Sequence, residues 1–103
     1  MYTTLTQENW EETVIKSDKV TLVDVWAPWC QPCRILGPTI EKIAKEHPEY
    51  NICKLNADDE SILTTSLGVR NIPTCFIYKN GEIVDKFVGV LPESDILYKL
   101  SNI

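Results

Sequence analysis

Residues 20–27 read V-T-L-V-D-V-W-A, which is apolar on both faces of an extended chain. Val20, Leu22 and Trp26 would lie on one face of such a strand, and Val23 and Val25 on the other. Apolar residues on both faces are typical of a central strand that is covered on both sides. We therefore predict a strand in the interior of a sheet.

A helix is predicted directly after this strand, from residue 30 toward residue 47. Pro28 ends the strand, and Pro32 fits the first helical turn, where its missing N–H group is not needed. Glu41 and Lys45 are spaced as an exposed ion pair on this helix. The apolar residues of the segment recur at helical spacing, at Ile35, Leu36, Ile40, Ile43 and Ala44.

The remaining pattern predicts further strands at residues 2–5, 50–56, 74–79 and 82–88, and further helices at about 6–15, 61–67 and 92–100. The helix at 61–67 is expected to bury Ile62 and Leu63 and to end at Gly68. Asn80 and Gly81, between the last two strands, are a strong signal for an antiparallel hairpin.

This order of elements, βαβαβα followed by ββα, indicates an α/β fold. Its mixed sheet would be parallel in the first part and would carry helices on both faces. The chain of 103 residues is long enough for one hydrophobic core, and 44% apolar with 24% charged residues is ordinary for a globular domain. We expect a single domain over residues 1–103.

The charge of the chain excludes some classes of function. A net charge of −5 argues against nucleic-acid binding and against attachment to anionic membranes. No stretch approaches the length of a membrane span, and the acidic N-terminus lacks the features of a targeting segment. The chain is therefore expected in the cytoplasm, where a close cysteine pair is more often catalytic or metal-binding than structural.

Cys30 and Cys33 carry the candidate chemistry. At the start of the predicted helix the first N–H groups have no intrahelical partner and the helix dipole is positive, so a thiolate at Cys30 is favoured. Cys33 follows three residues later on the same helix face, so the two sulfur atoms can meet and form a reversible disulfide. The alternatives are a structural disulfide or half of a zinc site, but Cys53 and Cys75 do not form the second close pair that zinc usually requires.

Asp24 interrupts the apolar face of the central strand. A buried carboxylate without partners is energetically costly and tends to keep its proton. The alternative is an aspartate at a strand edge, exposed to solvent and without a role. Cys53 and Cys75 lie within predicted strands and are interpreted as small buried apolar residues, with a regulatory thiol as the alternative. A proline such as Pro73 at the start of a strand needs no special role.

The sequence W-A-P-W-C-Q-P-C-R at residues 26–34 resembles the active-site motif of the thioredoxin family, with Gln31 where that family usually has glycine. The resemblance covers essentially the whole chain. It implies the thioredoxin fold, with a central mixed sheet of about five strands flanked by four helices. It also implies a thiol–disulfide oxidoreductase that reduces disulfides in other proteins.

The resemblance assigns roles to individual residues. Cys30 corresponds to the nucleophile and Cys33 to the resolving thiol. Asp24 matches the buried acid that exchanges a proton with the second cysteine, and Lys54 matches the lysine near that acid. Ile72-Pro73-Thr74 matches the cis-proline loop of the family. The residues implied to contact substrate are Trp29, Gln31, Pro32, Ile72, Pro73 and Gly89.

The resemblance also implies the partners. The substrates would be disulfide-containing proteins, and the electron donor an NADPH-dependent flavoprotein thioredoxin reductase. No cofactor beyond the cysteine pair is expected, and the domain would act as a monomer. Because residues between the cysteines influence redox poise, Gln31 leaves open an oxidant or isomerase of the same fold. A docking module without turnover is a further alternative.

Overall fold

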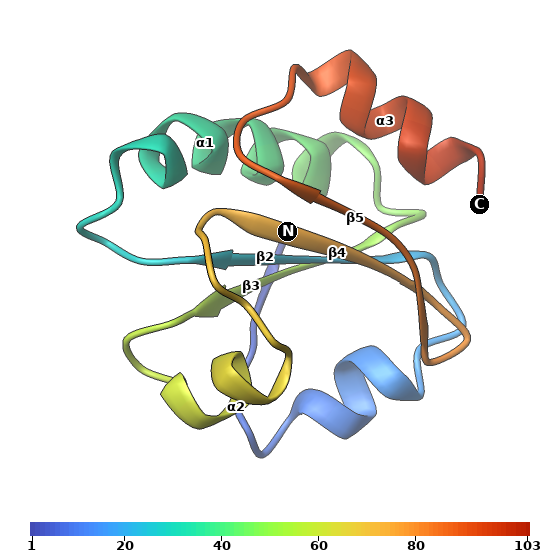
Figure 1. The fold of residues 1–103 in the computed structure, drawn as a ribbon. Coiled ribbons are helices and arrows are strands. Elements are labelled where there is room, and N and C mark those ends of the chain that lie inside the picture. Colours follow the sequence, from blue (N-terminus) through green and yellow to red (C-terminus); the bar gives the residue numbers. More distant parts are fainter.

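The computed structural model describes residues 1–103 and consists of a five-stranded sheet between two layers of helices (Figure 1). The strands are β1 (Thr3–Thr4), β2 (Thr21–Trp26), β3 (Asn51–Asn56), β4 (Thr74–Lys79) and β5 (Glu82–Val88). The helices are the short π-helical segment η1 (Glu11–Ile15), α1 (Gln31–Glu46), α2 (Ser61–Ser66) and α3 (Glu93–Ser101). None of these helices has the length and apolar character needed to cross a bilayer.

The strands are arranged in the order β1-β3-β2-β4-β5. The pairs β1–β3 and β3–β2 are parallel, whereas β2–β4 and β4–β5 are antiparallel. The mixed sheet predicted from the order of elements is therefore confirmed, and β2 is its middle strand. Successive side chains of β2 point to opposite faces of this sheet, as in any β-strand.

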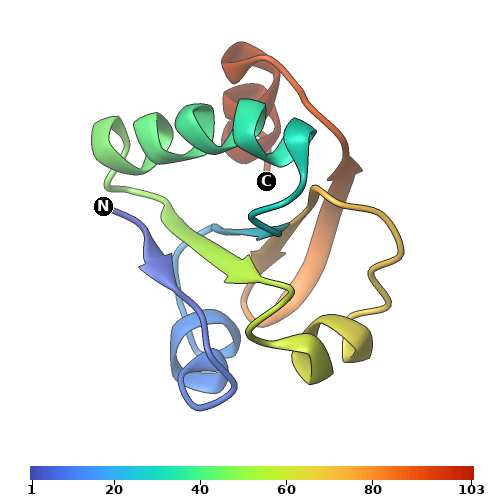
Figure 2. The same ribbon diagram turned by 90° about the vertical axis from the view of Figure 1, so that its left-hand side faces the viewer.

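The sheet divides the core into two clusters. The turned view in Figure 2 shows helices on both faces of this sheet. On one face, Leu22 packs with residues of α1 and α3, including Ile40 and Ile96. On the other face, Val23 and Val25 pack with residues of η1 and α2. Both faces of β2 are thus covered by helices, which explains why its sequence has apolar residues on both faces.

The hairpin between β4 and β5 forms where the sequence predicts it. Asn80 and Gly81 both adopt a positive φ, of 53° and 80°. This left-handed pair matches the twist of the two flanking strands. A Cβ atom at Gly81 would also lie 2.8 Å from the carbonyl oxygen of Ile15, so both backbone conformation and space require glycine there.

Several side chains differ from the helical predictions. Ile62 in α2 is 72% exposed, although it was expected to be buried, and Ile35, one of the apolar positions of the predicted helix at residues 30–47, is 59% exposed. Adjacent helix positions point about 100° apart, so in each case only the following leucine, Leu36 or Leu63, reaches the sheet. The predicted ion pair of Glu41 with Lys45 is also wrong, because Glu41 binds Lys54 on β3 instead.

Candidate active site

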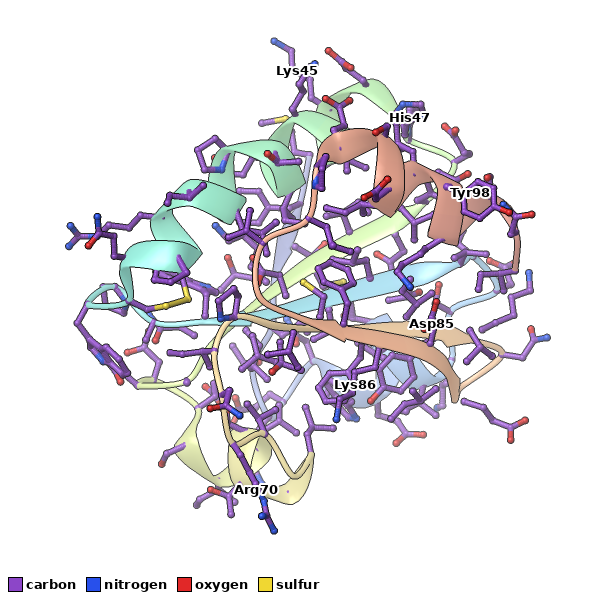
Figure 3. All side chains as sticks on the ribbon, turned by 45° about the horizontal axis from the view of Figure 1, so that its top comes forward. Lys45, His47, Arg70, Asp85, Lys86 and Tyr98 are labelled. Carbon is purple, nitrogen blue, oxygen red and sulfur yellow. A yellow bond between two sulfur atoms is a disulfide. The ribbon has the colours of Figure 1, made fainter.

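The cysteine pair lies at the junction between the middle strand and the longest helix. β2 ends at Trp26, and Cys30 is the N-cap residue of α1, with an extended backbone. A disulfide joins Cys30 to Cys33, whose Cα atoms are 5.2 Å apart (Figure 3, yellow bond). The prediction that the two sulfur atoms meet is confirmed.

The start of α1 surrounds Cys30 with positive electrostatic potential. The backbone N–H of Cys33 donates a hydrogen bond to Cys30 Sγ at 3.3 Å. Pro32 occupies the first turn, as predicted, and this turn contains no acidic residue that would oppose a negative sulfur. When the disulfide is reduced, the same N–H group and the helix dipole favour the Cys30 thiolate.

Trp29 and Gln31 lie on the surface beside the disulfide. Trp29 is 68% exposed, and its indole Nε1 donates a hydrogen bond to Asp58 Oδ1 at 3.2 Å. Gln31 and Pro32 are also exposed. Nothing in the local sequence pattern connects Asp58 to a tryptophan 29 positions earlier, so this contact could not be predicted from the sequence.

The loop before β4 faces the cysteines. The Ile72–Pro73 peptide bond is cis, as the resemblance implied. Ile72 packs against the small cluster of Ala27, Cys30 and Cys33, and its carbonyl oxygen lies 3.7 Å from Cys30 Sγ. Pro73 itself is buried, so Ile72 is the side chain of this pair that reaches the surface.

Gly89 is attached to the same loop. Its N–H donates a hydrogen bond to the carbonyl oxygen of Pro73 at 2.9 Å. Its φ is 90°, and a Cβ atom there would meet no other atom within 4 Å. The backbone conformation therefore requires glycine here, and the space beside it is open to another chain.

Asp24 is buried on β2, with 1% of its surface exposed, so the alternative of a solvated edge residue is excluded. The sheet register places it between Lys54 on β3 and Cys75 on β4. The thiol of Cys75 donates to Asp24 Oδ1 at 3.8 Å, whereas Oδ2 has no hydrogen-bond partner. Burial raises the pKa of Asp24 from 3.8 to about 6, against the opposing effects of the Lys54 charge and the Cys75 hydrogen bond.

Lys54 does not form an ion pair with Asp24. Its ammonium Nζ binds Glu41 Oε2 of α1 at 2.8 Å and lies over the rings of Trp26 and Tyr2, 4.8 and 5.2 Å from their centroids. Glu41 was missed as a member of the site because its partner lies on a different element. The ammonium also lies 3.7 Å from the position of a Cβ atom at residue 37, where glycine leaves room for it.

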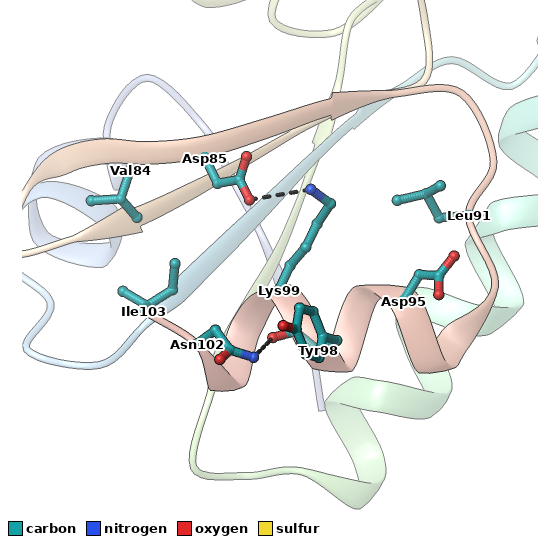
Figure 4. A pocket seen from close by; sticks show the side chains of 8 residues that line it. All are labelled: Val84, Asp85, Leu91, Asp95, Tyr98, Lys99, Asn102 and Ile103. Carbon is teal, nitrogen blue, oxygen red and sulfur yellow. Dashed lines mark hydrogen bonds and ion pairs between the residues drawn. The ribbon is translucent and has the colours of Figure 1, made fainter.

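Two cavities open on the surface. One, of about 330 Å³, brings together Cys33, Lys54 and Glu41, so the second cysteine and the Lys54–Glu41 pair share a cleft. The other, of about 460 Å³, lies between β5 and α3 around the Asp85–Lys99 ion pair and contains none of the predicted site residues (Figure 4).

Cys53 and Cys75 are free thiols that are fully buried, which confirms their interpretation as small buried residues. Burial raises the pKa of Cys53 to about 12 and also raises the pKa of Cys75. No three His, Cys, Asp or Glu side chains lie close enough together to hold a metal ion. Of the four cysteines, Cys30 and Cys33 are the two whose sulfur atoms lie together.

Comparison with known proteins agrees with this geometry. The family model described as Thioredoxin matches residues 1–102. "Thioredoxin 2" of Chlorobaculum tepidum is 44% identical over 102 residues, which cover 98% of this chain and 94% of that protein. "Thioredoxin M-type, chloroplastic" of Pisum sativum is 42% identical over 95 residues, covering 91% of this chain and 55% of that protein.

Solved structures include a similar one. The thioredoxin of Malassezia sympodialis superimposes with a TM-score of 0.87 at 28% sequence identity, over 99% of this chain and 90% of that one. Proteins of this kind exchange electrons through their own dithiol and disulfide, without a cofactor. The chain thus belongs to the thioredoxin family and has the fold of that family, and it is a thiol–disulfide oxidoreductase whose reactive couple is Cys30–Cys33.

Proposed function

We propose that this protein works as a reductant of disulfides in other proteins, with Cys30 as the nucleophile. The observation that carries the proposal is the hydrogen bond from the Cys33 N–H to Cys30 Sγ at the N-terminus of α1. This contact, together with the helix dipole, stabilises negative charge on the first sulfur atom of the pair.

The reaction then has two exchange steps. The Cys30 thiolate attacks one sulfur atom of the substrate disulfide, forming a mixed disulfide and releasing the other substrate sulfur as a thiolate that takes up a proton. Cys33 next loses its proton and attacks Cys30 Sγ. The Cys30–Cys33 bond forms, the bond to the substrate breaks, and the second substrate thiol is released.

We assign Asp24 as the acceptor of the Cys33 proton, directly or through water. Support comes from its burial, from a pKa of about 6 that lets it exchange protons near neutral pH, and from an oxygen without a partner. Lys54 would act on Asp24 through its charge. The shared cleft of Cys33 and Lys54 supports this arrangement.

The substrate would lie across the surface around the disulfide. Exposed Trp29 offers an apolar platform, and the open space beside Gly89 admits a second backbone. Gln31, Pro32 and Ile72 complete the proposed contact surface, and buried Pro73 would contribute through the cis bond that presents Ile72. These residues match the motif of the family, and the loop of Ile72, Pro73 and Gly89 lies against the cysteines.

We further propose a single domain over residues 1–103 that acts as a monomer in the cytoplasm and is regenerated by an NADPH-dependent thioredoxin reductase. Membership of the family supports the electron donor. Several relatives are named as chloroplastic, so fractionation of the source cells is the test of the compartment.

Two measurements test the function. In an insulin reduction assay with dithiothreitol as the donor, the protein should accelerate precipitation of the insulin chains, whereas a docking module would not. Titration of the cysteine pair against glutathione then gives its reduction potential. A potential near that of strong dithiol oxidants, about −120 mV, rather than near about −270 mV, would overturn the reducing direction.

A further inference from the structure

The side-chain carboxyl of Asp24 has a single hydrogen-bond partner, the thiol of Cys75. Three strands contribute to this environment, because the register sets Asp24 of β2 beside Cys75 of antiparallel β4 and Lys54 of parallel β3. The thiol donates to Oδ1 at 3.8 Å, and no group binds Oδ2. The two oxygens of one carboxylate are therefore inequivalent.

The Cys75 thiol is a permanent donor in this contact. Its side chain is fully buried, and burial together with the neighbouring Asp24 carboxylate raises its pKa well above the ordinary value. Asp24 titrates near pH 6, far below the range where Cys75 could ionise. Across the pH range in which Asp24 exchanges its proton, Cys75 thus keeps its own.

The other ionisable groups around Asp24 have different partners. Lys54 on β3 is bound to Glu41 of α1, and Cys33 of α1 lines the cleft that contains this pair. The charges that act on Asp24 are those of Lys54 and Glu41, and its one hydrogen-bond donor is Cys75 on β4. Lys54, Glu41 and Cys33 donate no hydrogen bond to Oδ1 or Oδ2.

We propose that Cys75 is a positioning residue for proton transfer: its thiol occupies Oδ1 of Asp24 and leaves Oδ2 as the oxygen that takes and returns the proton of Cys33. The inference rests on the proposed role of Asp24 as the proton acceptor. In the transfer, the Cys33 S–H bond breaks and an O–H bond forms at Oδ2, while the sulfur keeps the electron pair and attacks Cys30 Sγ.

The residue type suits both demands of the position. Cys75 belongs to the apolar cluster under α1 and α3, so its side chain must be small and compatible with an apolar core. A purely aliphatic residue would leave both oxygens of Asp24 without a donor. The thiol packs like an aliphatic group and still supplies one weak hydrogen bond.

The direct test follows the protonation of Asp24 itself. The ¹³C signal of its carboxyl carbon is titrated by NMR in the wild type and in three variants, Cys75→Ala, Cys75→Ser and Cys53→Ala. In Cys75→Ala the midpoint should rise by about half a pH unit, because the carboxylate loses its donor. Cys75→Ser keeps a donor, so its midpoint should not exceed that of the wild type.

Cys53→Ala is the matched control. Cys53 is as buried as Cys75 and lies on β3, the other neighbour of β2. Its side chain packs on the opposite face of the sheet and does not contact Asp24. Its midpoint should equal that of the wild type. Cys75→Val, which fills the site without a donor, replaces Cys75→Ala if that variant does not fold, and should show the same rise.

A second readout separates this inference from the role of Asp24. The rate at which Cys33 resolves a preformed mixed disulfide is measured against pH, and its midpoint should follow the NMR midpoint in every variant. An unchanged NMR midpoint in both Cys75→Ala and Cys75→Val would overturn the role of Cys75. A shifted NMR midpoint with an unchanged rate profile would instead overturn Asp24 as the acceptor, and the proposal with it.

Discussion

The four cysteines of this chain fall into two groups with opposite chemistry: Cys30 and Cys33 are joined by a disulfide, whereas Cys53 and Cys75 are separate thiols on opposite faces of the sheet. Cys30 and Cys33 are 5% and 4% exposed, and Cys53 and Cys75 are 0% exposed, so burial alone hardly distinguishes the two groups. The difference lies in the backbone around them. Cys30 caps α1, where N–H groups are free to face a sulfur atom, whereas Cys53 and Cys75 lie in strands that pair with neighbours on both sides.

The same residue type thus becomes either reactive or inert. At the helix N-terminus, the Cys33 N–H and the dipole favour a thiolate. In the sheet, the backbone donors are used by strand pairing and the apolar surroundings raise the pKa of the thiols, to about 12 for Cys53. Reactivity in this fold therefore depends on where unpaired backbone donors remain.

The largest difference between the two groups should appear when one cysteine of each is replaced. Cys30→Ser should reduce insulin reduction to the uncatalysed background, because a hydroxyl does not replace the attacking thiolate. Cys53→Ser should retain activity in the folded protein. Equal losses of activity in the two variants would show that Cys30 and Cys53 do not differ in reactivity as described.

Trapping experiments distinguish the roles of Cys30 and Cys33. Cys33→Ser should accumulate a mixed disulfide with protein substrates through Cys30, because the resolving thiol is absent. The adduct is visible on a non-reducing gel and disappears with dithiothreitol. If Cys30→Ser traps partners equally well, the roles of nucleophile and resolving thiol are reversed.

Alkylation of the reduced protein compares all four thiols at once. At neutral pH, iodoacetamide should modify Cys30 rapidly, and Cys53 and Cys75 only after the protein is unfolded, because these are buried and protonated. Peptide mass spectrometry before and after addition of guanidinium gives the result. Rapid labelling of Cys75 in the native state would contradict its assignment as a permanent donor.

Replacing Asp24 should have opposite effects on the rate of resolution and on stability. Its pKa is raised on folding from 3.8 to about 6, so the folded state is penalised above pH 6 by about 3 kcal/mol. Asp24→Asn should therefore be more stable than the wild type at neutral pH by up to this amount. The difference should shrink as the pH falls from 6 toward 4, where the carboxyl is protonated in both states.

Urea denaturation at neutral and acidic pH measures this gain, and single-turnover kinetics measure the expected slower resolution by Cys33. A variant that is stabilised but resolves mixed disulfides at the wild-type rate and pH dependence would remove Asp24 from the mechanism. The stabilisation of that variant would still show that burial of the Asp24 carboxylate is costly.

The smallest expected effect concerns Glu41. Its charge offsets that of Lys54 and raises the pKa of Asp24, so Glu41→Gln should shift the Asp24 titration to lower pH by about half a unit. The same NMR titration measures it. Glu49→Gln, which removes an exposed carboxylate bound to His47, is the control that should leave the midpoint unchanged.

Local patterns in the sequence predicted much of the fold. The two-sided apolar run of β2, the helix at Cys30 and the Asn80-Gly81 hairpin each follow from short-range rules, and all are present. The exposed Ile35 and Ile62 show where these rules fail, because periodicity does not reveal how far a helix face is covered.

Contacts between distant residues could not be predicted in the same way. Trp29–Asp58, Lys54–Glu41 and Cys75–Asp24 join residues 29, 13 and 51 positions apart. Each depends on sheet register or on the rotation of a helix over the sheet, and no local spacing records either. The cis bond before Pro73 was expected from the family resemblance alone.

The short span of the reactive pair limits how the molecule can signal its oxidation state. Cys30 and Cys33 lie three positions apart in the opening turn of a single helix, so making or breaking their bond closes or opens a small ring and joins no separate elements. The framework of strands has no reason to rearrange between the two forms. Any protein that binds one form and releases the other must therefore recognise a change of a few atoms at the tip of α1.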